Sequence, residues 1–261
     1  MQQTRPGTGT FMWNELLTTD VDKARAFYAA VLGWDFKPVD MGPMGTYWLV
    51  HAGGALAGGI GKLDCPDGVQ IPPHWLGYVA VKDVNEVAKR AGEAVLVPPS
   101  DIPDVGRFTM VKDPSGAVVA FMTPMAGVEP KPSNPPVPSG HFMWNELVSS
   151  DPAAAGKFLC GLTGWGTQKM PMEKFEYTLF TVGEYMAAGM MPLGKPHWAD
   201  VPSHWMGYIS VPDLKAAQAK VAANGGKVNV PPTPVPGIGT FIVITDPTGA
   251  FVSLMQPLPQ Q

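Results

Sequence analysis

The chain opens with a short apolar run that leads into a helical stripe. Residues 11–18 are rich in aromatic and aliphatic side chains, as expected of a half-buried strand. Asp20 follows at a position suited to the N-cap of a helix, and Gly33 is placed to end that helix. The apolar residues between them recur at helical spacing: Val21, Ala24, Phe27, Tyr28 and Val31. These signals predict a strand followed by a helix.

The same order returns in the second part of the first 125 residues. Short strand-like runs broken by Gly and Pro follow the first helix, over 34–39, 46–52 and 55–62. A new apolar run begins at His74, and Asp83 and Gly92 bracket a second helical stripe. Three more strand-like runs cover 94–98, 107–112 and 117–123. Each part therefore predicts one βαβββ module.

The whole pattern is then repeated once. Residues 11–16, Phe-Met-Trp-Asn-Glu-Leu, recur letter for letter as residues 142–147. Other pairs keep the same order: Gly33-Trp34 with Gly164-Trp165, His74-Trp75 with His204-Trp205, and Asp113-Pro114 with Asp246-Pro247. We therefore expect two tandem domains, 10–125 and 141–257, each built of two modules. The Pro-rich stretch 126–140 is expected to be the linker.

Composition narrows the choice of partners and compartment. Hydrophobic residues make up 45% of the 261 residues, which is enough for packed cores. The formal net charge of −4 offers no basic surface for a phosphate backbone, so we expect no nucleic-acid partner. Neither a secretory signal nor an apolar stretch of membrane-spanning length is visible, so a cytoplasmic protein without membrane contact is expected. Cys65 and Cys160 are not equivalent in the repeats, which argues against a disulfide framework.

The motifs in this order resemble a known superfamily. The helix reading Ala-Arg-Ala-Phe-Tyr over 24–28, with Leu-Gly-Trp over 32–34 and Asp-Pro-Ser-Gly over 113–116, is similar to the signature of the vicinal oxygen chelate superfamily. This is the glyoxalase, bleomycin-resistance and extradiol dioxygenase group, and tandem two-domain glyoxalase-like proteins look most similar. The resemblance implies an α+β fold in which four βαβββ modules form curved mixed sheets around cups. It leaves the reaction open, because the fold hosts isomerases, lyases, dioxygenases and proteins that only sequester drugs.

The resemblance also implies where a divalent metal would be bound. Enzymes of the superfamily use His, Gln or Glu at positions that fall here on Trp13, Leu76 and Ala120, and in the second repeat on Trp144, Met206 and Ser253. None of these side chains is a strong ligand for zinc, iron or manganese. We therefore expect no metal and no other cofactor at these positions. A displaced divalent-metal site that pairs Glu15 with His74 is an alternative, and it would need at least one further donor.

Strand alternation gives the candidate ligand-binding residues. If Trp13 and Leu76 face the cup, the side chains two positions away do so as well. The predicted set is Trp13, Glu15, His74 and Tyr78 in the first repeat, and Trp144, Glu146, His204 and Tyr208 in the second. Glu15 and Glu146 are the predicted polar anchors or general bases, because a carboxylate among apolar residues needs a partner. Structural roles are the alternative: the carboxylates bind backbone amides or a histidine, the histidines seal the rim, and the aromatic residues pack.

Three functions fit these observations. The leading interpretation is a metal-free protein that binds a small apolar or aromatic molecule, as a monomer with an internal pseudo-dimer or as a homodimer. The second is an enzyme of glyoxalase, lyase, isomerase or dioxygenase type that uses Glu15 and Glu146 as general bases or in a displaced metal site. The third is a scaffold whose cups are filled by Trp and Met side chains.

Overall fold

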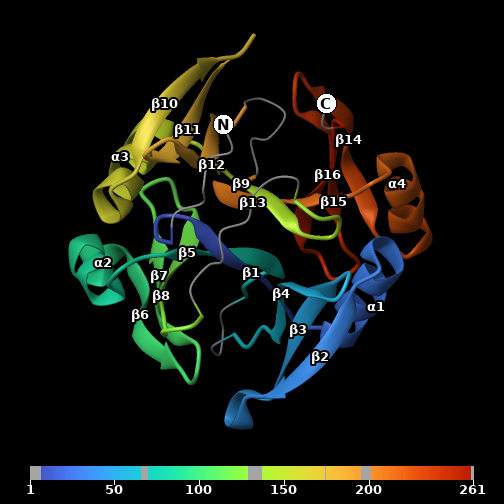
Figure 1. The fold of residues 1–261 in the computed structure, drawn as a ribbon, viewed down its shortest axis with the longest axis horizontal. Coiled ribbons are helices and arrows are strands. Elements are labelled where there is room, and N and C mark those ends of the chain that lie inside the picture. The colour runs from blue at the N-terminus through green and yellow to red at the C-terminus, as the bar shows by residue number, and fades with distance from the viewer. Residues whose placement is uncertain (1–6, 66–69, 129–136, 174, 195–200, 260–261) are drawn as a thin grey trace. The chain divides into compact units, whose positions relative to one another are not determined.

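The predicted βαβββ order is present four times in the computed structural model, which describes residues 7–65, 70–128, 137–173, 175–194 and 201–259 (Figure 1). Part of the predicted linker, 129–136, lies outside the described residues. The first repeat contains β1 (Phe11–Thr18), α1 (Val21–Leu32), β2 (Asp35–Asp40), a 3-10 turn (Gly42–Met44), β3 (Thr46–Ala52), β4 (Ala55–Lys62), β5 (His74–Ala80), α2 (Val84–Ala91), a second 3-10 turn (Gly92–Ala94), β6 (Val95–Ile102), β7 (Gly106–Lys112) and β8 (Val118–Pro124). The second repeat contains β9 (Phe142–Ser149), α3 (Pro152–Thr163), β10 (Gly166–Pro171), β11 (Glu176–Val182), β12 (Tyr185–Pro192), β13 (His204–Ser210), α4 (Leu214–Ala223), β14 (Lys227–Val235), β15 (Gly239–Thr245) and β16 (Phe251–Pro257).

Each repeat supplies one eight-stranded mixed sheet. The strand order is β2-β3-β4-β1-β5-β8-β7-β6 in the first and β10-β11-β12-β9-β13-β16-β15-β14 in the second. The pairs β1–β4, β5–β8, β12–β9 and β13–β16 are parallel, and the hairpins that flank them are antiparallel. The predicted α+β class is therefore confirmed.

The helices begin and end where the sequence predicts. The Asp20 carboxylate accepts a hydrogen bond from the backbone N–H of Lys23 at 3.0 Å, which satisfies one of the free amides of the first turn. At the other end Gly33 takes the left-handed conformation, with φ of 68°, and its N–H bonds back to the carbonyl of Ala29. Asp83 caps α2 in the same way.

The contacts divide the chain into two compact units that cut across the repeats. Unit 1 comprises Met1–Met12, Gly77–Pro135 and Asn145–Trp205, and unit 2 comprises Trp13–Leu76, Pro136–Trp144 and Met206–Gln261. Unit 1 thus combines the second module of the first repeat with the first module of the second repeat. Unit 2 combines the other two modules. The repeat pattern alone does not show whether modules form a core within one repeat or between repeats. Here each core forms between modules of different repeats.

The core of each unit is built by helices from both repeats. In unit 2, α1 packs beside α4, and in unit 1, α2 packs beside α3 (Figure 1). The buried helical residues of unit 2 are Ala24, Phe27, Tyr28, Val31, Leu214, Ala217 and Val221, and those of unit 1 are Val84, Val87, Ala91, Ala155, Leu159 and Leu162. The predicted apolar stripes are therefore the surfaces on which modules of different repeats meet.

A buried polar network stabilises the core of unit 2. The Tyr28 hydroxyl donates to Asp246 Oδ2 at 3.0 Å and accepts from the indole N–H of Trp75 at 3.0 Å. Asp246 is only 3% exposed, and its Oδ1 accepts from Thr248 and from the backbone of the hairpin that follows it. Burial raises the pKa of the Tyr28 hydroxyl well above its usual value, and the charge of Asp246 adds to this effect. Tyr28 therefore stays protonated and keeps its hydrogen bond to the carboxylate.

Tyr28→Phe should lower the free energy of unfolding by about 1–3 kcal/mol, because it leaves a buried carboxylate oxygen and an indole N–H without their partner. Equilibrium unfolding in denaturant measures this change. Tyr185→Phe, at a half-buried tyrosine of β12, is the control and should change stability by less than about 0.5 kcal/mol. Equal losses in the two variants would contradict the role given to the Tyr28 hydroxyl.

Candidate functional site

Two buried carboxylates occupy equivalent positions on the first strand of each repeat. Glu15 on β1 is 9% exposed and Glu146 on β9 is 7% exposed. Glu15 Oε2 accepts a hydrogen bond from the Tyr47 hydroxyl at 2.8 Å, and Glu146 Oε2 accepts one from the Tyr177 hydroxyl at 2.6 Å. The expectation that each carboxylate needs a partner is therefore met by a tyrosine in both repeats.

The direction of the hydrogen bonds around Tyr47 follows from the chemistry of its neighbours. The indole N–H of Trp13, which can only donate, lies 2.9 Å from the Tyr47 oxygen. The Tyr47 hydroxyl therefore accepts a hydrogen bond from Trp13 and donates its own hydrogen bond to Glu15 Oε2. The chain Trp13–Tyr47–Glu15 lies entirely within unit 2.

A glycine makes the Tyr47–Glu15 contact possible. Tyr47 lies on β3, and β4 separates that strand from β1, which carries Glu15. Gly59 of β4 is the register partner of Glu15, and a Cβ atom there would collide with the Tyr47 hydroxyl. Gly61, two positions along the same face, lies under the ring of Tyr47. These glycines let the tyrosine cross the strand. The second repeat keeps the first of them, since Gly189 is the register partner of Glu146.

The two predicted histidines share one geometry. His74 Nδ1 lies 2.8 Å from the carbonyl oxygen of Pro72, and His204 Nδ1 lies 2.8 Å from that of Pro202. A carbonyl only accepts, so Nδ1 carries the proton in each neutral ring and Nε2 is left as the acceptor nitrogen. Burial lowers the pKa of the His204 imidazole below its usual value, which favours this neutral form.

The remaining predicted residues lie among apolar side chains. In unit 2, Tyr208 packs in a buried cluster with Met206 and Met255, and Trp144 lies against this cluster. In unit 1 the ring of Tyr78 lies 6.1 Å from that of Phe108, measured between centroids. Tyr78 and Tyr208 are 5% and 7% exposed. The side chains that pack around Tyr208 are aromatic and Met-rich, a composition also found in small-molecule sites.

The residues at the positions where the superfamily binds metal do not fit a transition-metal ion. Leu76 and Ala120 are buried hydrocarbons, and Trp13 uses its indole N–H for Tyr47. Met206 and Ser253 at the equivalent positions of the second repeat are poor ligands for zinc, iron or manganese. Within the described ranges, no group of three or more His, Cys, Asp or Glu residues is placed to hold an ion.

The sequence interpretation missed Tyr47 and Tyr177. They are 130 residues apart in the numbering, the same offset as His74 and His204, so the repeat itself contained the signal. What the sequence does not give is the order of the strands, and without it a contact that passes over an intervening strand is invisible.

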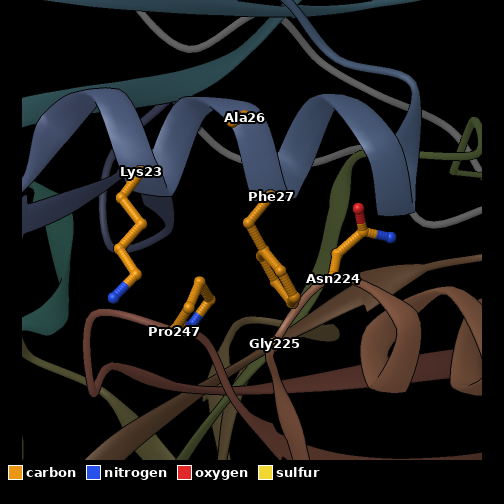
Figure 2. Close-up of a pocket in the computed structure, with 6 residues that line it drawn as sticks. All are labelled: Lys23, Ala26, Phe27, Asn224, Gly225 and Pro247. Atoms are coloured by element: carbon orange, nitrogen blue, oxygen red, sulfur yellow. The ribbon is translucent and has the colours of Figure 1, made fainter.

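A surface pocket in unit 2 lies apart from the predicted residues. It has a volume of about 310 Å³ and is lined by Lys23, Ala26, Phe27, Asn224, Gly225 and Pro247. Figure 2 shows Phe27 extending from α1 toward Gly225, between Lys23 and Asn224. A second pocket of about 280 Å³ lies in unit 1 and likewise contains none of the predicted residues.

In the described part of the chain, every helix is too short or too polar to traverse a lipid bilayer.

Sequence comparison shows that this chain is similar to known protein families and to individual proteins. Residues 139–254 match the family described as glyoxalase/bleomycin resistance protein/dioxygenase superfamily, and residues 10–45 match the bleomycin resistance protein-like N-terminal family. A provisionally named glyoxylase of Mycobacterium tuberculosis, CFP32, is 34% identical, with 97% of each chain covered. The anthracycline biosynthesis protein DnrV of Streptomyces peucetius is 28% identical and covers 97% of this chain and 95% of its own.

Solved structures show the same fold at low sequence identity. The Mn(II)-bound glyoxalase from Novosphingobium aromaticivorans has a TM-score of 0.62 at 16% identity and covers 98% of this chain and 84% of its own. The 2,3-dioxygenase LapB from Pseudomonas sp. KL28 has a TM-score of 0.61 at 13% identity. The match covers 96% of this chain and 93% of the LapB chain. These similarities confirm the predicted vicinal oxygen chelate fold with two tandem domains of glyoxalase type.

Gly59→Ala should destabilise the protein by roughly 1–3 kcal/mol, because the new methyl group meets the Tyr47 side chain. Gly61→Ala is the matched control on the same face of β4, where a Cβ would lie 3.3 Å from Tyr47 and Leu17, and its loss should be smaller. A Gly59→Ala, Tyr47→Ala double-mutant cycle, followed by denaturant unfolding, should show strong coupling. Additive effects of the two changes would rule out the proposed crossing.

Stability should fall when the pH is lowered from 7.5 to 5.5, partly through His204. Because the pKa of this imidazole is lower in the folded than in the unfolded protein, the unfolded chain binds more protons in this range. The stabilisation is thus complete above the unfolded pKa, about 6.5, and is lost as the pH falls toward the folded value. Thermal unfolding at both pH values should show a smaller loss in His204→Gln than in the wild type. Equal losses would contradict this contribution.

Proposed function

The chain belongs to the glyoxalase/bleomycin resistance protein/dioxygenase superfamily, and on this basis we propose that it binds a small, partly aromatic molecule in each repeat. Glu15 and Glu146 are the polar anchors of the two sites, and Tyr47 and Tyr177 orient them. The observation that carries the proposal is the tyrosine–carboxylate pair, which is buried and present in both repeats. A carboxylate in this position selects ligands that offer a hydroxyl or N–H donor.

The aromatic residues predicted from the sequence support an aromatic ligand. In unit 2, Trp13 lies beside the pair through its hydrogen bond to Tyr47 and offers a flat apolar surface. Tyr208, Met206 and Met255 form a buried cluster of the same unit with Trp144 against it, and Tyr78 offers an aromatic surface in unit 1. His74 and His204 contribute an acceptor nitrogen near the start of β5 and β13. The relationship to DnrV, whose name places it in anthracycline biosynthesis, supports a planar, hydroxylated ligand.

Binding of dihydroxyanthraquinone, followed by calorimetry and thermal shift, tests the proposal. Unsubstituted anthraquinone is the matched ligand and should bind more weakly, because it lacks donors for the carboxylates. Glu15→Gln and Glu146→Gln should each weaken one site about 10- to 100-fold, since each removes a hydrogen bond to a charged group.

Glu184→Gln removes an exposed carboxylate and is the control for the change of charge; it should leave binding unchanged. Far-UV circular dichroism of each variant confirms that the fold is intact. Wild-type affinity in the Glu15→Gln, Glu146→Gln double variant would refute the assignment of the anchors. No binding by the wild type would reject a planar hydroxylated ligand of this kind.

A second candidate function is catalysis of glyoxalase type, and the 34% identity to the mycobacterial glyoxylase over 97% of both chains favours it. In that case Glu15 and Glu146 are general bases, because a carboxylate in an apolar site is well placed to accept a proton. Trp13, Leu76 and Ala120, at the positions where the superfamily binds metal, and Met206 and Ser253 in the second repeat, are poor metal ligands, which favours a route through the carboxylates. A glyoxalase assay with and without a chelator distinguishes the two functions. Turnover that survives chelation and is lost in both Glu→Gln variants identifies an enzyme. Elemental analysis of the same protein should then give less than one metal ion per chain.

A further inference from the structure

The two units carry the same buried framework with one residue exchanged. In unit 2 the Tyr28 hydroxyl joins the indole of Trp75 to the hairpin carboxylate of Asp246. Their counterparts in unit 1 are Trp205 and Asp113, and the counterpart of Tyr28, in the second repeat's Phe-Leu-Cys sequence, is Leu159. Unit 1 therefore has the same donor and the same acceptor but no hydroxyl between them.

Two polar atoms of unit 1 are left in the core by this exchange. Trp205 Nε1 and Asp113 Oδ2 are both buried, and neither has a hydrogen-bond partner among the residues that the structure describes. The other oxygen of Asp113 is satisfied, since Oδ1 accepts from the backbone and hydroxyl of Ser115 at 2.7 Å and from the N–H of Ala117 at 3.2 Å. A buried carboxylate oxygen and a buried indole N–H are each costly without a partner. These two atoms are the counterparts of the two atoms that the Tyr28 hydroxyl joins in unit 2.

We infer that unit 1 contains a binding site for a single water molecule between Trp205 Nε1 and Asp113 Oδ2. The indole N–H only donates and the carboxylate only accepts, so the occupant must accept one hydrogen bond and donate another. A metal cation receives no ligand from an N–H group, an anion is repelled by the carboxylate, and an ammonium ion offers no acceptor. Water meets both requirements, and the aliphatic side chain of Leu159 leaves the place of the phenol oxygen to it.

The position of the site links it to the second repeat's predicted binding residues. Trp205 follows His204 directly at the start of β13, and their side chains point to opposite faces of the sheet. The water thus holds the strand from the core side while His204 faces the other way. This inference rests on the packing of unit 1 and does not depend on the proposed function.

Two-dimensional NMR of the indole protons tests the site. In the wild type, the Trp205 Hε1 resonance, assigned through Trp205→Phe, should show a cross-peak to a long-lived water. Leu159→Tyr supplies a hydroxyl at the place of the water, so this cross-peak should disappear. The hydroxyl should also raise Tm above that of the matched variant Leu159→Phe by about 2–4 °C.

A second variant keeps the test decisive if Leu159→Tyr does not fold. Tyr28→Leu recreates the unit 1 arrangement in unit 2, so a new water cross-peak should appear at the indole proton of Trp75. The absence of a water contact at Trp205 in the wild type overturns the inference. So does a Leu159→Tyr variant that folds but is no more stable than Leu159→Phe.

Discussion

The hydrogen bond between the Tyr28 hydroxyl and the Asp246 carboxylate lies where modules of different repeats share one core, and that sharing organises the rest of the structure. A βαβββ module has one helix and four strands, and the helix of each module packs beside a helix of the other repeat. The sheets follow the repeats, whereas the cores combine modules from both of them. A duplicated gene can build such cores without a second chain, because each module finds its partner within the same polypeptide.

The same packing determines where polar groups can be placed on the strands. On β1, Leu16 is fully buried in the core of unit 2, so its neighbour Glu15 must point to the opposite face. On β9, Leu147 and Glu146 repeat the arrangement in unit 1. A slip of one residue would bury the carboxylate in the helix-facing core and expose the leucine, so hydrophobic packing fixes the register of the site.

Local features of the fold were predictable because their causes are local. The Asp20 cap, the left-handed Gly33 and the bounds of β3 and β4 agree with the sequence interpretation. The end of β6 does not: the strand was expected to stop at Pro98 and continues to Ile102. This strand lies at the edge of its sheet, where a proline costs no ladder hydrogen bond on the open side. The sequence patterns also do not predict that modules of different repeats share a core, because this pairing depends on contacts between segments far apart in the chain.

In the candidate site, too, local features are predictable from the sequence and contacts between distant segments are not. Glu15 and its face were accessible from strand alternation, but its partner Tyr47 lies two strands away and reaches it only because Gly59 has no side chain. The buried network shows a different kind of freedom. Leu159 occupies the position in unit 1 that Tyr28 occupies in unit 2, whereas the tyrosine–carboxylate pair is present in both repeats. A water molecule can take over the hydrogen bonds of a buried hydroxyl, so the network tolerates the exchange. The tyrosine–carboxylate pair shows no such exchange, and its presence in both repeats accords with the proposed binding role.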